Sequence, residues 1–344
     1  MFGAYKYLFA PAKARFSGLP AENSLFSNFH MPQPIKPPAL QPGDMVRVLS
    51  LASPAEECLL TKGCAEIERL GFRANLDPET ALARDGYFSG SVPLRLAALK
   101  QSLADPDSRA IVCSRGGYGS NYLLEDLCVA PASPKILLGY SDITSLQIYL
   151  WQKFGWITFY GPMVASNFAN GIGSPNGYDR KSLLHAITET SKGWTIDLAG
   201  ECMLAGSAEG VLLGGCLTLI ETTLGTPWEL DTRGAILILE DRGMKPYQVD
   251  RALMHLKQAG KLKSVKGIVL GDFPECEPAA GAEPLKPIAK RILEPLGVPV
   301  AWGAAIGHTP RPMLTLPVGV RAHLTVDADR TLTRLEILEP ACVA

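Results

Sequence analysis

The stretch KILLGYSDITSLQIYLWQKFG, residues 135–155, places a short apolar run directly before a segment with the apolar period of a helix. The first residues, through Ser141, predict a buried β-strand, and the remainder predicts a helix of ordinary length. Ser141 therefore lies in the turn between a strand and a helix. Because ligands in open α/β sheets bind outside the carboxyl ends of strands, this turn is a candidate site.

The same alternation of strand and helix continues on both sides of this stretch. Upstream, VRVLSLAS (46–53) and AIVCS (110–114) predict strands, and PLRLAALKQSLADP (93–106) predicts a helix. Downstream, AILILED (235–241) and GIVLGDF (267–273) predict further strands, with helical patterns after each. Strands that alternate with helices of this size predict an α/β fold with a mostly parallel sheet.

The chain of 344 residues is long enough for two ordinary domains. We expect an α/β domain with a mostly parallel sheet and a nucleophile elbow at 37–165, and a C-terminal mixed α/β domain at 209–344. Between them, residues 166–208 are rich in Gly and Ser and predict a linker with one helix. Residues 1–36 have no clear period and predict a loose N-terminal extension.

Composition excludes several classes of function. The apolar fraction is 47%, the charged fraction 19% and the net charge −1, so no basic field exists to hold a nucleic acid or an anionic membrane surface. No run reaches the roughly 18 apolar residues that a membrane span needs. The eight cysteines form no CxxC pair and predict buried, reduced thiols. We therefore expect a cytoplasmic protein without nucleic-acid or membrane partners.

The turn at Ser141 has two interpretations. A serine between a buried strand and a helix presents its hydroxyl, and the next amide lies at the positive end of the helix, as in a nucleophile elbow. The G-x-S-x-G pattern is incomplete, because Ile143 stands at the position of the last glycine. Ser141 or Asp142 as an ordinary helix N-cap explains the residues equally well.

A second glycine-containing segment, SRGGYGS (114–120), also follows a predicted strand. Gly116 and Gly117 allow backbone amides to approach a ligand closely, which suits an oxyanion or a phosphate. The segment lacks the lysine of a P-loop, which disfavours nucleotide binding. A glycine-rich turn without a ligand is the alternative.

Among the five histidines, His308 stands apart, because AIGHTPRP (305–312) follows an apolar β-run. A histidine that acts as a base needs a nucleophile and an orienting carboxylate. Glu240, at the end of ILILE, is the first candidate for that carboxylate, and Asp241 and Asp250 are its rivals. The sequence has no HExxH motif and the histidines are dispersed, so we predict no metal site.

Taken in order, RGGYGS, LLGYSDIT, LGTPWELDTRGAILILED, PYQVDRAL and GHTPRPMLTLPVG resemble the serine peptidase family of LD-carboxypeptidases and microcin-immunity peptidases. The similarity extends from about Pro37 to the last predicted strand. The resemblance implies that Ser141 is the nucleophile, His308 the general base and Glu240 the residue that orients the histidine.

The resemblance also implies an oxyanion hole and substrate contacts. The oxyanion hole would use the amide of Asp142 and one from the region of Gly116 and Gly117, and which glycine donates stays open. Arg115 and Arg311 lie beside the implied catalytic segments and are candidate cations for a substrate carboxylate. Tyr118 is a further candidate for substrate contact.

The implied reaction is cofactor-free hydrolysis of the L,D-peptide bond that releases terminal D-Ala from the murein tetrapeptide in peptidoglycan recycling, by a homodimer. One alternative is a microcin-immunity-type peptidase acting on peptidyl or aminoacyl adenylates. A non-catalytic peptide-binding protein on the same frame is another. A thiol-dependent amidotransferase is disfavoured, because position 141 is serine rather than cysteine.

Overall fold

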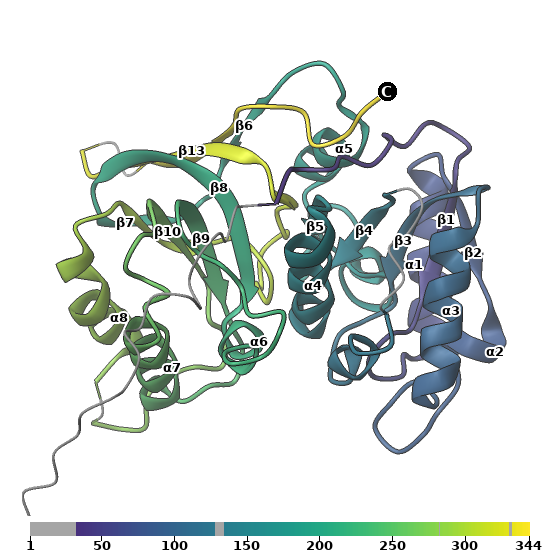
Figure 1. Ribbon diagram of the computed structural model, residues 1–344, viewed down its shortest axis with the longest axis horizontal. Helices are drawn as coiled ribbons and strands as arrows, with labels where there is room; N and C mark the ends of the chain where they lie inside the picture. The colour runs from purple at the N-terminus through teal and green to yellow at the C-terminus, as the bar shows by residue number, and fades with distance from the viewer. Residues whose placement is uncertain (1–31, 128–133, 282, 330–331) are drawn as a thin grey trace, which may run out of the picture. The chain divides into compact units, whose positions relative to one another are not determined.

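The computed structural model describes residues 32–127, 134–281, 283–329 and 332–344 (Figure 1). Residues 1–31, most of the extension expected at 1–36, lie outside the described residues. The rest of that segment packs on the folded chain, where Lys36 forms an ion pair of 2.7 Å with Glu339. From residue 32 onward the described chain forms one compact unit.

Within the described residues, the first sheet has six strands in the order β12-β5-β4-β3-β1-β2. The strands from β1 to β5 pair in parallel, and all four residues of β4 are buried, as a parallel sheet covered on both faces requires. The edge strand β12 pairs antiparallel with β5 and tolerates Pro317, which lacks an N–H donor for a further strand. The strands are β1 (Met45–Leu49), β2 (Arg73–Leu76), β3 (Ser108–Cys113), β4 (Ile136–Gly139), β5 (Thr158–Tyr160) and β12 (Leu316–Val318).

The second sheet, as far as the structure describes the chain, has eight strands in the order β6-β14-β13-β8-β9-β10-β11-β7. Its centre, β8 to β11, is parallel, and antiparallel strands flank that centre on both sides. The strands are β6 (Trp194–Asp197), β7 (Glu201–Leu204), β8 (Gly206–Cys216), β9 (Ala235–Glu240), β10 (Gly267–Gly271), β11 (Val300–Ala304), β13 (Arg321–Asp327) and β14 (Leu332–Ile337).

Helices accompany both sheets, as Figure 1 shows. Helix α4 contacts strands of both, namely β5 and β8, and its first eight residues are all buried. A helix that is buried around most of its circumference needs partners on several sides, which two sheets provide. The α-helices are α1 (Glu57–Arg69), α2 (Pro78–Ala81), α3 (Val92–Ala104), α4 (Thr144–Phe154), α5 (Arg180–Thr188), α6 (Leu217–Thr222), α7 (Pro246–Gln258) and α8 (Leu285–Leu293).

The predicted fold class is confirmed: a mostly parallel N-terminal sheet is followed by a mixed α/β part. The segment 166–208, expected to be a linker with one helix, is more structured than expected. Besides α5 it supplies the edge strands β6 and β7 of the second sheet. Its short strands alternate too briefly among Gly and Ser for their period to be distinguished from a loop.

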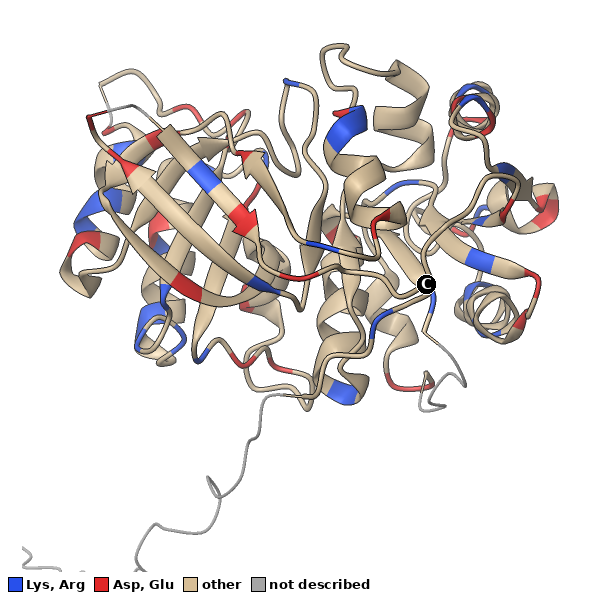
Figure 2. Ribbon diagram, turned by 90° about the horizontal axis from the view of Figure 1, so that it is seen from above, with Lys and Arg blue, Asp and Glu red and all other residues tan. Residues whose placement is uncertain are grey.

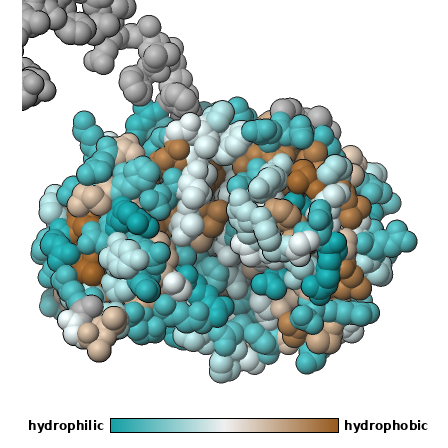
Figure 3. Space-filling view, turned by 90° about the horizontal axis from the view of Figure 1, so that it is seen from below, coloured by the Kyte–Doolittle hydropathy of each residue, from teal (hydrophilic) through white to brown (hydrophobic). Residues whose placement is uncertain are grey.

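Charged residues of both signs are mixed along the described chain, and hydrophobic residues are scattered over the face drawn in Figure 3. Figure 2 shows Lys and Arg interspersed with Asp and Glu over both halves of the described chain. On the face in Figure 3, hydrophobic residues form separate groups surrounded by hydrophilic ones. None of the helices within the described residues has the length and apolar character that crossing a membrane requires.

Candidate active site

Ser141 occupies a strained turn at the carboxyl end of β4. Its φ is 62°, in the left-handed region that non-glycine residues seldom adopt, and it opens the 3₁₀ turn Ser141–Ile143 that leads into α4. Such strain persists only where surrounding structure enforces it, and it concentrates at functional sites. The strand–turn–helix context is that of a nucleophile elbow. Neither Ser141 nor Asp142 caps α4 with its side chain, so the N-cap interpretation does not describe this turn.

The glycine-rich loop after β3 lies directly against this turn. A Cβ added to Gly116 would lie 2.8 Å from Ser141 Cβ, 3.0 Å from Ser141 Oγ and 3.4 Å from the Asp142 amide nitrogen. Only glycine allows this approach. Gly117 has a φ of 107°, and a Cβ there would collide with Ser53. The loop and the turn thus form one backbone-lined corner beside the serine hydroxyl.

Buried polar groups fasten the loop to the turn. The carboxylate of Asp142 is fully buried and accepts a hydrogen bond of 2.8 Å from the Ser120 amide, while the Asp142 carbonyl accepts one of 2.6 Å from the Ser120 hydroxyl. Arg95, on α3, is also buried and donates to the carbonyls of Leu51 and Gly119 at 2.7 Å each. The neighbouring Leu96 is only partly buried, so on this part of α3 the residue that enters the interior is the arginine.

Glu240 is the last residue of β9, and its side-chain carboxylate contacts both the backbone amide and the imidazole of His308. Glu240 Oε2 accepts a hydrogen bond of 2.8 Å from the His308 amide and lies 2.9 Å from His308 Nδ1. The carboxylate is fully buried, and the imidazole is partly exposed. A carboxylate at Nδ1 fixes the tautomer that leaves Nε2 free to accept a proton.

Tyr160, at the end of β5, joins this pair to the serine turn. Its hydroxyl donates a hydrogen bond of 2.5 Å to Glu240 Oε1 and accepts one of 3.4 Å from the Ser141 amide. Burial, and then the charge of Glu240, raise the pKa of Tyr160 well above its usual value, so the hydroxyl keeps its proton. The ring of Tyr140 lies edge-on to the His308 ring with centroids 5.1 Å apart. Ser141 and His308 make no direct hydrogen bond within the described chain.

The two partners shift each other's titration. Burial alone would raise the pKa of Glu240, but the charge of His308 and the hydrogen bonds from His308 and Tyr160 bring that pKa below its usual value. Burial alone would lower the pKa of His308, but Glu240 raises it above its usual value. At neutral pH the carboxylate is therefore ionised, and it stabilises a positive charge on the imidazole.

Gly307 allows the segment that carries His308 to lie directly against the Glu240 side chain. Its φ is 58°, and a Cβ at this position would overlap the Glu240 carboxylate. A glycine before His308 is therefore a steric requirement of the Glu240 site.

A cavity of about 490 Å³ opens beside this arrangement. Tyr140 and His308 line it, together with Asn167, Asn176 and the ion pair of Arg242 and Glu275. The cavity brings an apolar ring, side-chain amides and charged groups next to the imidazole. It has the composition of a site for a polar ligand with ionic groups.

Sequence comparison places this geometry in a known family. The model of the LD-carboxypeptidase N-terminal domain matches residues 46–161, and that of the C-terminal domain matches residues 209–324. The chain belongs to the LD-carboxypeptidase family. It is 36% identical over 303 residues to the probable murein peptide carboxypeptidase of Bacillus subtilis, with 86% of this chain and 93% of that protein covered.

Solved structures of the family share the fold. The muramoyltetrapeptide carboxypeptidase from Oxalobacter formigenes is 28% identical, with a TM-score of 0.75 over 86% of this chain and 99% of that one. The microcin C7 self-immunity protein MccF, in complex with aspartyl sulfamoyl adenosine, is 27% identical, with a TM-score of 0.80 over 90% of this chain and 100% of that one. Membership in this family supports a serine peptidase.

The structure places the rival carboxylates away from the imidazole. Asp241 accepts hydrogen bonds from the Thr218 amide and hydroxyl at 2.8 and 2.7 Å, at the start of α6. Asp250 lies on α7 and pairs with Arg291 at 3.5 Å. Within the described residues, the carboxylate at His308 Nδ1 is therefore that of Glu240.

The three candidate substrate contacts do not line the cavity beside His308, as far as the described residues go. The guanidinium of Arg311 is occupied by Asp272 and by two backbone carbonyls. Arg115 is exposed and donates to the Pro54 carbonyl at 3.3 Å. Tyr118 belongs to a cluster of aromatic rings that includes Tyr122.

Sequence reasoning missed Tyr160 and Arg242. Tyr160 follows the predicted helix by a few residues and ends a strand of three residues, too short for its period to mark it. Arg242 stands two residues after Glu240, and this proximity to a candidate catalytic residue was the available signal.

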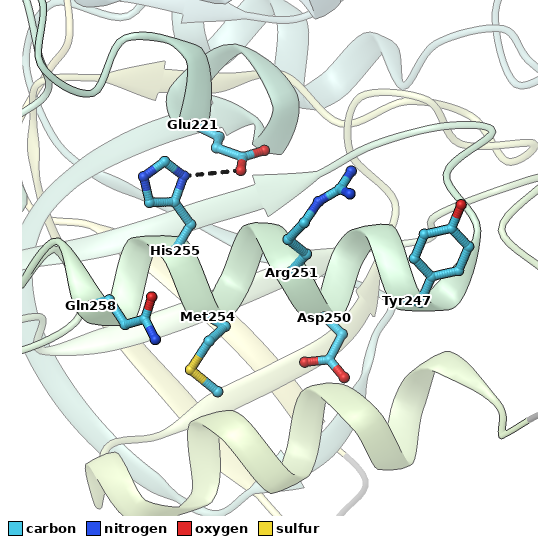
Figure 4. A pocket seen from close by; sticks show the side chains of 7 residues that line it. All are labelled: Glu221, Tyr247, Asp250, Arg251, Met254, His255 and Gln258. Atoms are coloured by element: carbon cyan, nitrogen blue, oxygen red, sulfur yellow. Dashed lines mark hydrogen bonds and ion pairs between the residues drawn. The ribbon is translucent and has the colours of Figure 1, made fainter. Parts of the chain in front are cut away.

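A second surface hollow, of about 480 Å³, lies over α7. Figure 4 shows that its side chains, apart from Glu221, rise from one face of this helix, and that His255 turns toward Glu221, 3.0 Å away. It offers no nucleophile next to a base, so it does not compete with the cavity beside His308. The described residues also contain no cluster of three or more His, Cys, Asp or Glu side chains suited to a metal ion.

Proposed function

We propose that this chain is a serine carboxypeptidase that releases terminal D-Ala from the murein tetrapeptide, as a step in the recycling of cell-wall peptides. The observation that carries the proposal is the Glu240–His308 pair, joined through Tyr160 to the strained turn of Ser141. The similarity to a probable murein peptide carboxypeptidase supports the choice of substrate.

In the proposed reaction, Ser141 Oγ attacks the carbonyl of the L-configured diamino acid while His308 Nε2 takes the hydroxyl proton. The amide of Asp142 and one from the loop of Gly116 and Gly117 stabilise the tetrahedral oxyanion. His308 then gives its proton to the departing amine of D-Ala, and an acyl-enzyme ester remains on Ser141. Water, deprotonated by His308, hydrolyses that ester and restores the serine.

The role of Glu240 is to hold the imidazole and to stabilise its charge. Because Nδ1 is fixed by the buried carboxylate, Nε2 is the nitrogen directed to the chemistry. Substrate binding has to bring His308 Nε2 within hydrogen-bond reach of Ser141 Oγ. The distance between a base and its nucleophile commonly shortens only in the substrate complex.

The test is release of D-Ala from L-Ala-D-Glu-diaminopimelate-D-Ala by the purified protein, measured beside the same peptide ending in L-Ala. We expect release from the first peptide and much less from the second. A serine-reactive phosphonate should label wild type at Ser141. A folded protein that resists labelling and cleaves neither peptide would be a binding protein instead. The homodimer expected from the resemblance belongs to this proposal, and sedimentation of the purified protein tests it.

A second candidate follows from the similarity to MccF, whose structure contains aspartyl sulfamoyl adenosine. In that case the same serine would cleave a peptidyl or aminoacyl adenylate analogue. Hydrolysis of aspartyl sulfamoyl adenosine, with no release of D-Ala from the tetrapeptide, would favour this candidate and leave the proposed triad unchanged.

A further inference from the structure

A carboxypeptidase has to distinguish a free terminal carboxylate from the continuing chain. A cation in the cavity provides that distinction, because charge-assisted hydrogen bonds to a carboxylate are stronger than neutral ones. Of the described residues that line the cavity beside His308, Arg242 is the only Lys or Arg. Arg311 is fully engaged with Asp272 and backbone carbonyls.

Arg242 is available for a ligand despite its ion pair. Its Nε and Nη2 donate to Glu275 at 3.0 and 2.5 Å, and within the described chain Nη1 has no hydrogen-bond partner. Both side chains are more than half exposed, at 56% and 60%. An ion pair this exposed contributes little to stability, so a structural role explains little of its position.

The loop that carries Glu275 is itself constrained. Glu275 and Phe273 have φ values of 60° and 51°, both in the left-handed region. The Gly243 amide donates to the Pro274 carbonyl at 3.0 Å, which ties this loop to the segment after Glu240. Glu275 therefore holds the guanidinium of Arg242 at the cavity.

We propose that Arg242 binds the terminal carboxylate of the substrate and makes the enzyme specific for free C-termini, with Glu275 as the residue that positions it. This inference rests on the proposed function, since it assigns the leaving D-residue to the side of the cavity that Arg242 lines. The guanidinium binds the carboxylate through Nη1 while Glu275 holds Nε and Nη2.

The experiment compares the tetrapeptide that ends in free D-Ala with the same peptide ending in D-alaninamide. Arg242→Gln should lower kcat/KM for the free acid by about 10-fold or more, as expected for loss of a hydrogen bond between charged groups. It should change kcat/KM for the amide by less than about 3-fold. Glu275→Gln should keep the preference for the free acid, because the cation remains.

Arg291→Gln is the matched control, because Arg291, on α8, is equally exposed, at 57%, and is paired with Glu283. Arg291→Gln should leave kcat/KM unchanged for both peptides. If Arg242→Gln and Glu275→Gln lower kcat/KM equally for the free acid and for the amide, the ion pair only holds the loop and the inference is wrong. If Arg242→Gln instead changes the preference for diaminopimelate over lysine in the third position, Arg242 recognises the side chain and the inference is also wrong. Wild type that cleaves neither peptide would refute the proposed function itself.

Discussion

The hydroxyl of Tyr160 donates a hydrogen bond of 2.5 Å to the buried carboxylate of Glu240, although the two residues are 80 positions apart in the chain. Tyr160 ends a strand of the first sheet and Glu240 ends a strand of the second. One hydrogen bond thus fixes the position of the carboxylate against β5, the strand that pairs with β4 and lies beside the serine turn. Neighbouring groups in such a network polarise one another, so its members are expected to act as a unit.

Tyr160→Phe should therefore lower kcat by about 10-fold at unchanged KM, because loss of a hydrogen bond to a charged group costs about 1.5–3 kcal/mol. The ring stays, so packing is preserved. Steady-state kinetics on the tetrapeptide, with circular dichroism as the check on folding, measure the effect. A rise in KM at constant kcat would show that Tyr160 acts on substrate binding instead.

Ser141→Ala and Ser141→Gly should both abolish turnover while leaving the protein folded. At an ordinary helical position glycine is less stable than alanine by about 1 kcal/mol. At φ 62° the order should disappear or reverse, because glycine adopts this conformation without strain. Denaturant unfolding of the two variants measures the difference. A glycine variant less stable by the ordinary 1 kcal/mol would show that the turn is not strained.

Glu240→Gln should reduce kcat by about 10²-fold or more, since glutamine loses the charge that stabilises the imidazolium and can present an amide donor to Nδ1. Asp241→Asn is the neighbouring comparison. Because Asp241 accepts hydrogen bonds from Thr218 at the start of α6, we expect its replacement to lower the melting temperature and to have little effect on kcat. Equal effects of both substitutions on kcat would reopen the choice of the orienting carboxylate.

The raised pKa of His308 predicts the acid limb of the pH profile. The base has to be neutral, so kcat/KM should rise with pH through a midpoint above the usual histidine value of about 6.5. In Glu240→Gln the residual activity should have a lower midpoint, because the group that raises the pKa is gone and burial still lowers it. An unchanged midpoint would assign the limb to another group.

The same pair predicts a window of stability. The pKa of His308 is higher in the folded than in the unfolded protein. Its contribution to the free energy of unfolding is therefore fully present below the unfolded-state pKa, and it is lost as pH rises through the folded-state pKa. The lowered pKa of Glu240 means that its contribution is lost as pH falls through its folded value. The melting temperature of wild type relative to His308→Gln should therefore be highest between these two limits. A difference that does not vary with pH would contradict this coupling.

Gly307→Ala should destroy activity, because the added methyl group overlaps the Glu240 carboxylate. Gly297→Ala is the matched control: its φ of 66° is similar to the 58° of Gly307, but a Cβ there meets nothing within 4 Å. Both variants bear the backbone strain of alanine, and only the first displaces Glu240 and His308. Assays and thermal unfolding of both variants separate the steric effect from the strain.

The sequence by itself determined the parallel arrangement of the first sheet and the position of Ser141 at a strand end. Both follow from local pattern: an apolar run such as ILLG forms a buried strand, and the apolar period of residues 144–154 forms a helix. The same logic placed Glu240 at the end of β9 and His308 after β11, each beside a strand terminus where side chains of an α/β fold meet ligands.

Only the tertiary structure decided which of these side chains meet. The contact of Tyr160 with Glu240, and the choice of Arg242 over Arg115 and Arg311 at the cavity, depend on how two sheets pack together. Periodicity specifies which face of a strand or helix is buried, but it contains no information on the distance between elements far apart in the chain. That distance is set by the packing of α4 between the sheets and by the close backbone approaches that glycines such as Gly116 and Gly307 permit.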